Sequence, residues 1–169
     1  MIGRTHDRAS HWAAYALTVL LLGYAAGKVV FALESRLGFP GGPPVSAAEH
    51  ERYARTVMDV ATAQWLAAAT GVLGALLVLA TTSRVARWLP RTAMLLLLGG
   101  LLLGLGAGAV TVIVDGFGGP GPGWSWYHGV VALTVLALMV GTIHSYVQAA
   151  KPIAADYGPQ PTCDSRSVR

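Results

Sequence analysis

Residues 23–34 read Gly-Tyr-Ala-Ala-Gly-Lys-Val-Val-Phe-Ala-Leu-Glu, and they end a long apolar run that contains one lysine. The run extends about 21 residues from Ala13 to Leu33, and about 20 such residues cross a bilayer as a helix. Because a signal peptide has a shorter apolar region and a small-residue cleavage site, we interpret the run as an uncleaved span. A charge inside a span costs a few kcal/mol, so Lys28 indicates a polar partner or a function.

The composition is that of an integral membrane protein. The chain has 169 residues, of which 54% are hydrophobic and 12% are charged, about half the charged fraction of a typical soluble domain. Three further stretches are long and apolar enough to cross a membrane. We predict an all-α fold, an antiparallel four-helix bundle with spans at about residues 12–33, 58–80, 92–114 and 128–148. These form one domain over residues 1–151, and a disordered cytoplasmic tail follows at residues 152–169.

A short additional helix is predicted before the second span. Ser46 and Glu49 match a capping box, directly after the proline- and glycine-rich residues 38–44, which exclude regular structure. Opposite charges then recur three and four residues apart, as in a helix at a water or headgroup interface. We expect an amphipathic helix from about Ala47 on the extracytoplasmic side. The sequence leaves open whether it continues into the second span or bends near Thr56.

The basic residues indicate how the bundle is oriented. Eight of them lie on the side of the termini and of the middle loop, and three lie on the other side. The eight are Arg4, Arg8, Arg84, Arg87, Arg91, Lys151, Arg166 and Arg169. Since cytoplasmic loops are enriched in Lys and Arg, we predict a multi-pass protein of a bacterial cytoplasmic membrane with both termini cytoplasmic. Topology also accounts for the net charge of +4, so we predict no nucleic-acid partner.

All four predicted spans bring polar residues to the outer leaflet. The candidate catalytic residues are Lys28, Glu34, Asp59, Asp115 and His128, and the candidate ligand-binding residues are Gln64, Thr111, Trp124 and Trp126. Burial and a nearby ammonium move carboxyl pKa values in opposite directions, so such a cluster is suited to general acid–base chemistry. We therefore predict an outer pocket for a lipophilic small molecule or membrane lipid, with acid–base isomerisation or cyclisation as a candidate reaction. Asp59 or Asp115 would be the proton donor or base, Lys28 would tune it, and the two tryptophans would face a cationic transition state.

Simpler explanations exist for each member of this cluster. Asp59, Asp115 and His128 lie within a turn of a span end, where a charged group reaches water. Lys28 can extend its ammonium toward the interface. The same groups would also suit binding of an anionic headgroup, proton movement, or the fixing of helix register.

Small residues four apart suggest a second class of function, a non-catalytic accessory subunit. Gly100, Gly104 and Gly108 form one row in the third span, and such rows let membrane helices approach closely. We expect this row to pack inside the bundle, and the alternative is a seam for a homodimer or another membrane protein. A small transporter is a third hypothesis, which the lack of an inverted repeat or broken helices disfavours.

The sequence predicts neither a metal nor another cofactor. Cys163 is the single cysteine, so an intrachain disulfide and cysteine-based zinc sites are excluded. A b-type haem needs two histidines at one depth on different helices. His11 with His144 and His50 with His128 satisfy that condition, but the second and third spans contain no histidine.

The Gly23–Lys28 stretch and the following Leu37-Gly38-Phe39-Pro40-Gly41 turn carry a family resemblance. They resemble small uncharacterised bacterial four-span membrane proteins with a lysine late in the first span. They also resemble DoxX-type membrane proteins, whose first span ends with a similar glycine-then-lysine pattern. The resemblance covers mainly the first 45 residues and the number of spans, and it implies no activity and no functional residue.

Overall fold

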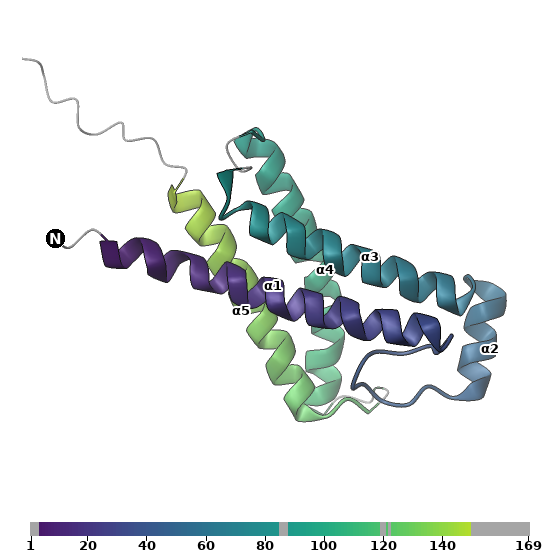
Figure 1. Ribbon diagram of the computed structural model, residues 1–169. Helices are drawn as coiled ribbons and strands as arrows, with labels where there is room; N and C mark the ends of the chain where they lie inside the picture. Colours follow the sequence, from purple (N-terminus) through teal and green to yellow (C-terminus); the bar gives the residue numbers. More distant parts are fainter. Residues whose placement is uncertain (1–3, 85–87, 119–120, 122, 150–169) are drawn as a thin grey trace, which may run out of the picture.

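The structure, a computed structural model, describes residues 4–84, 88–118, 121 and 123–149, with side chains from residue 11 onward. The described residues form five α-helices, and Figure 1 shows their arrangement. They are α1 (Arg4–Leu33), α2 (Ala47–Thr56), α3 (Val60–Ala80), α4 (Arg91–Gly116) and α5 (Trp126–Ala149). All except α2 are long and apolar enough to cross a membrane. The predicted all-α four-helix membrane bundle is therefore confirmed, whereas the predicted tail at residues 152–169 lies outside the described residues.

The short helix before the second span is present, and it is separate from that span. The Ser46 side chain accepts a hydrogen bond from the Glu49 backbone N–H, and the Glu49 carboxylate accepts one from the Ser46 backbone N–H at 3.2 Å. This reciprocal pair is the predicted capping box. Asp59 caps the next helix by accepting from the Thr62 N–H at 2.9 Å. Each helix therefore starts at its own N-cap, the Asp59 cap separates α3 from α2, and α2 lies across the end of α3 (Figure 1).

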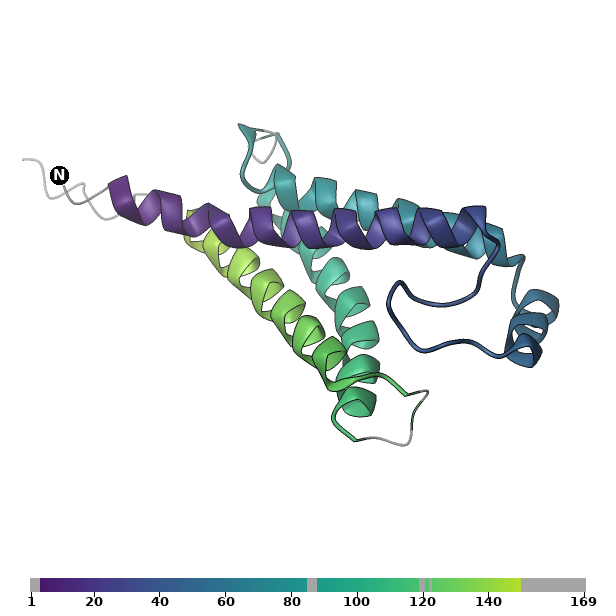
Figure 2. The same ribbon diagram turned by 60° about the horizontal axis from the view of Figure 1, so that its bottom comes forward.

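The spans pack as two antiparallel pairs. Helix α1 runs beside α3 along most of its length, and α4 runs beside α5. Helix α1 also crosses α5, whereas α3 and α4 contact each other little. Figures 1 and 2 show the consequence: the pairs meet near the N-terminus of α1 and diverge toward the end that carries α2. We call this divergent side the α2 end of the bundle.

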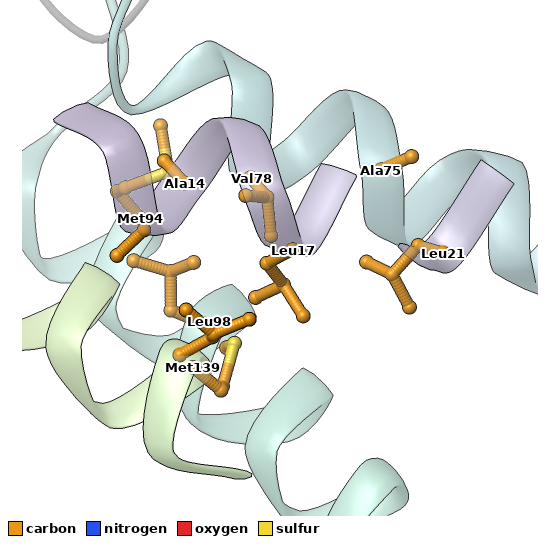
Figure 3. Packing of buried hydrophobic residues seen from close by; sticks show 10 residues of the cluster. Ala14, Leu17, Leu21, Ala75, Val78, Met94, Leu98 and Met139 are labelled. Carbon is orange, nitrogen blue, oxygen red and sulfur yellow. The ribbon is translucent and has the colours of Figure 1, made fainter. Parts of the chain in front are cut away.

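The apolar core lies where the two pairs meet (Figure 3). Its buried members are Ala13, Ala14, Leu17, Leu21, Ala75, Val78, Met94, Leu98, Leu138 and Met139. Leu17, Val78, Leu98 and Met139 are fully shielded from solvent. Because lipid tails are as apolar as these side chains, such a core holds helices together by close packing and not by removal from water.

The α4 glycine row does not pack inside the bundle, so the expected intramolecular role was wrong. A Cβ atom added at Gly100, Gly104 or Gly108 would meet no described atom within 4 Å. The reason is the rotation of α4, which turns Met94 and Leu98 toward the core and the glycine row away from it. Close approach of backbones occurs at Gly71 of α3 instead, where an added Cβ would lie 3.0 Å from the Tyr24 ring.

Candidate functional site

The site is built around the loop that joins α1 to α2, residues 34–46, which we call the α1–α2 loop. Gly38 (φ 139°) and Gly41 (φ 75°) adopt conformations that favour glycine, and they bracket Phe39 and Pro40. The Pro40 ring rests against Gly27 of α1, where an added Cβ would lie 2.5 Å from the ring. Gly27 precedes the end of α1 by six residues, about 9 Å along a helix. The loop therefore folds back alongside its own span (Figure 2).

Lys28 and Gln64 hold the returning loop from two different helices. The Lys28 ammonium donates to the Gly38 carbonyl at 2.7 Å. The Gln64 amide donates to the same carbonyl at 3.2 Å and to the Arg36 carbonyl at 2.9 Å. Both side chains are buried, with exposed fractions of 8% and 3%. A loop carbonyl has two lone pairs, so it can accept both donors at once.

The charge of Lys28 is compensated without a carboxylate. Its ammonium lies 5.7 Å from the centre of the Tyr24 ring and 5.3 Å from that of Phe39, within the range of a cation–π interaction. Among the residues that the structure describes, no carboxylate forms an ion pair with it within 4.0 Å. Lys28 thus has the polar partner that was expected for a charge inside a span, but that partner is the backbone carbonyl of Gly38 and not an acidic side chain.

His128 anchors the other side of the loop from α5. Its Nε2 lies 2.6 Å from the Gly41 carbonyl oxygen, and because a carbonyl only accepts, we assign the proton to Nε2. The imidazole packs edge-on against Trp124 at 5.0 Å and in a tilted arrangement against Tyr127 at 4.1 Å between ring centres. Its buried Nδ1 has no hydrogen-bond partner among the described atoms. This interaction joins α5 to the loop of the opposite helix pair.

Asp115 positions Trp124 in the connection between α4 and α5. One oxygen of its buried carboxylate accepts from the backbone N–H groups of Gly123 at 2.9 Å and Trp124 at 2.7 Å. The Trp124 ring then packs edge-on against Phe39 at 5.4 Å between centres. It also covers Gly42, where an added Cβ would lie 2.8 Å from the indole. Each of the four spans therefore contributes one polar side chain that binds backbone of the α1–α2 loop or of the α4–α5 connection.

The other predicted site residues lie apart from this network. Glu34 pairs with Arg36 at 2.9 Å on the surface. Asp59 is exposed and caps its own helix, where the Thr62 backbone N–H and then the Thr62 hydroxyl lower the pKa of its carboxyl. The Thr111 hydroxyl donates to Ala107 within α4. Trp126 is 66% exposed and contacts Tyr127.

A cavity of about 480 Å³ lies between the α1–α2 loop, α2 and Trp124. Most of its wall is apolar or aromatic, and three ionisable side chains from α2 complete it. The wall residues are Leu37, Gly38, Phe39, Pro43, Pro44, Val45, Glu49, Arg52, Tyr53, Thr56, Val57 and Trp124. Of the nine residues predicted for the site, only Trp124 is in this wall; the other eight, all described, are not.

Sequence reasoning missed the contribution of α2 to this wall. Glu49, Arg52, Tyr53 and Thr56 recur at spacings of three, one and three residues, which places them on one helical face. That spacing, soon after the proline pair 43–44, is a signal from which the cavity wall could have been predicted.

The described residues contain no group of three His, Cys, Asp or Glu side chains placed to hold a metal ion. His144, one of the histidines considered for haem, lies 3.3 Å from the Gln148 amide on its own helix. No known protein family matches the chain, and no curated protein or solved structure matches it significantly. The fold defines a multi-pass membrane protein, and its function has to be argued from the site itself.

Proposed function

We propose that this membrane protein binds a lipophilic or amphiphilic small molecule in the cavity between the α1–α2 loop, α2 and Trp124. The observation that carries the proposal is the cavity itself, which is largely apolar and about 480 Å³ in volume. Pockets of about 300–1,000 Å³ with apolar walls and a few polar groups typically hold one small organic molecule. We further propose that the cavity faces the outer side of a bacterial cytoplasmic membrane, with both termini cytoplasmic, because the charge asymmetry favours that orientation.

The anchoring network supports binding because it fixes the cavity wall in advance. Phe39 and Trp124 form part of the wall, and hydrogen bonds to nearby backbone groups fix the position of each. The Gly38 carbonyl beside Phe39 accepts hydrogen bonds from Lys28 and Gln64, and the backbone N–H of Trp124 donates one to the Asp115 carboxylate. A wall that is ordered before the ligand arrives lowers the entropic cost of binding.

The geometry favours binding without turnover over an isomerase or cyclase. Asp59 and Asp115, the predicted proton donors or bases, and Lys28, predicted to tune them, do not line the cavity. Among the wall residues, the side chains that carry an acidic group are Glu49, with a carboxyl, and Tyr53, with a phenol. An isomerisation or cyclisation in this cavity would have to use one of these two groups.

The test is to identify the lipophilic compounds that co-purify with the wild-type protein and with matched tryptophan variants. Trp124→Ala removes a wall residue, whereas Trp126→Ala removes a tryptophan two positions away that is 66% exposed and outside the wall. We expect a compound that is retained by wild type and Trp126→Ala and lost from Trp124→Ala. Identical compound profiles for all three proteins would contradict the proposal.

A second candidate function, the accessory subunit, is favoured by the surface of α4. Gly100, Gly104 and Gly108 are uncovered, and α4 buries the smallest share of its residues among the four spans. A second copy of the chain or another membrane protein would cover this face. Gly104→Leu should lower self-association measured by energy transfer in liposomes, and unchanged association would remove this candidate seam.

A further inference from the structure

We propose that the molecule bound in the cavity is an anionic amphiphile, with its charged head at Arg52 and its apolar part against Phe39, Tyr53 and Trp124. This inference rests on the proposed function, because it names the chemical class of ligand for the same cavity. The inference depends on which cationic side chains at the α2 end already have a hydrogen-bond or ion-pair partner.

Arg52 differs from the other cationic side chains near the loop. Arg36 pairs with Glu34 and lies over the Phe31 ring, Arg55 pairs with Glu51, and Lys28 donates to the Gly38 carbonyl. Arg52 also belongs to the cavity wall, but within the described part of the chain its guanidinium has no hydrogen bond and no ion pair within 4.0 Å. A guanidinium presents five N–H donors in a planar fork that matches carboxylate, sulfate or phosphate oxygens.

The rest of the wall suits the apolar part of such a molecule. Phe39, Tyr53 and Trp124 supply three aromatic side chains, and Pro43, Pro44, Val45 and Val57 supply aliphatic surface. A wall that combines a cation with apolar side chains is complementary to a molecule with an anionic head and an apolar body. The same wall thus provides a cation for the anionic head and apolar surface for the rest of the molecule.

Glu49 is the group that opposes an anion, because it lies in the same wall. Hydrogen bonds from the Ser46 side chain and backbone lower the pKa of its carboxyl, and the positive charge of Arg52 lowers it further. It is therefore ionised near neutral pH and repels an anionic head. Two substitutions on one helical face consequently have opposite expected effects: Arg52→Gln weakens binding of an anion and Glu49→Gln strengthens it. Glutamine at position 49 can preserve the capping box, since Gln also serves at that position.

The experiment uses Trp124 as an internal reporter in the full-length protein. Trp12, Trp65, Trp88 and Trp126 are all exposed, so each is replaced by phenylalanine to leave Trp124 as the fluorophore. Quenching is titrated in nanodiscs with three probes of equal chain length, ω-bromoundecyl sulfate, ω-bromoundecanol and ω-bromoundecyltrimethylammonium. The sulfate should bind about fivefold to tenfold more tightly than the alcohol, as expected for a charge-assisted hydrogen bond that is partly open to solvent.

Arg52→Gln should abolish the preference for the sulfate, and Glu49→Gln should increase it. Arg55→Gln is the matched control, because Arg55 lies three residues further along α2, pairs with Glu51 and is outside the wall. It should keep the wild-type preference. Equal affinities for sulfate and alcohol, a preference for the ammonium probe, or a sulfate preference that survives Arg52→Gln would overturn the anionic assignment alone. If none of the probes quenches Trp124 saturably, the cavity binds no amphiphile, and the proposed function fails with it.

Discussion

The shared carbonyl of Gly38 allows a quantitative test of the anchoring network. Lys28 and Gln64 both donate to it, at 2.7 and 3.2 Å. In Lys28→Met the carbonyl keeps Gln64, and in Gln64→Leu it keeps Lys28. In the double variant both donors are lost and the carbonyl has no partner when the loop is closed. The two substitutions should therefore be strongly non-additive.

The magnitude follows from the separate contributions. Lys28→Met removes a hydrogen bond from a charged group, about 1.5–3 kcal/mol, but it also removes the desolvation cost of a buried ammonium, which is several kcal/mol. We expect a net change of about 1 kcal/mol or less in loop opening. Gln64→Leu loses neutral hydrogen bonds, about 1 kcal/mol. The unpaired carbonyl of the double variant adds about 1–2 kcal/mol beyond the sum, which appears as the interaction energy of the double-mutant cycle.

Hydrogen exchange of the α1–α2 loop, followed by mass spectrometry in detergent, measures this opening. The Gly42 amide, which donates to the Phe39 carbonyl at 2.8 Å, is a suitable probe inside the loop. Since about 1.4 kcal/mol corresponds to a factor of ten, the double variant should exchange about fivefold to thirtyfold faster than the product of the single effects. Thr111→Val, which removes a hydroxyl that bonds only within α4, is the control. Additive effects of the two substitutions would refute the shared-acceptor reasoning.

Three further predictions concern packing and caps. Gly71→Leu should destabilise the fold by about 1–3 kcal/mol in SDS unfolding, because an added Cβ lies 3.0 Å from Tyr24, whereas Gly23→Leu, with nothing within 4 Å, should have little effect. Ser46→Ala should cost about 1 kcal/mol of α2 stability, visible as faster hydrogen exchange of α2; unchanged exchange would contradict the role of the cap. Because hydrogen bonds from Ser46 lower the pKa of Glu49 from its ordinary 4.5, its stabilisation of α2 should be complete above that value. It should then be lost as the pH falls through the lower pKa of the folded state, and Glu49→Gln should remove that pH dependence.

The sequence was sufficient for the fold because its signals are local. Apolar stretches of span length predicted the four membrane helices, and the spacing of Ser46 and Glu49 predicted the start of α2. The break before α3 could not be decided in advance. Asp59 was interpreted as a candidate acid, whereas it is the N-cap that separates the two helices. A cap and a catalytic carboxylate look alike until the position of the neighbouring backbone is known.

The site was predicted only in part, because its contacts are made by backbone. The sequence predicted a common depth for Lys28, Gln64, Asp115 and His128, and in the structure all four contact backbone of the two inter-helix connections. Their partners are loop carbonyl and N–H groups, which every residue possesses and which therefore leave no mark in a sequence. For the α4 glycines, periodicity identified the row but could not give the rotation of the helix about its axis. That rotation decides whether a row faces the core or the outside.

The four polar side chains share one physical role, which is to satisfy backbone hydrogen-bonding groups of the connections between helices. Irregular backbone at membrane depth is tolerated only where protein or water satisfies its polar groups. The α1–α2 loop returns as far as Gly27, on the side where the two helix pairs diverge (Figure 2). Lys28 and Gln64 supply donors from one helix pair, and His128 supplies one from the other. A lysine that would be costly in a lipid-facing helix is thus accounted for by its hydrogen bond to a loop carbonyl. The proposed ligand binding then depends on the cavity-wall groups that have no hydrogen bond or ion pair among the described residues, of which Arg52 is the clearest.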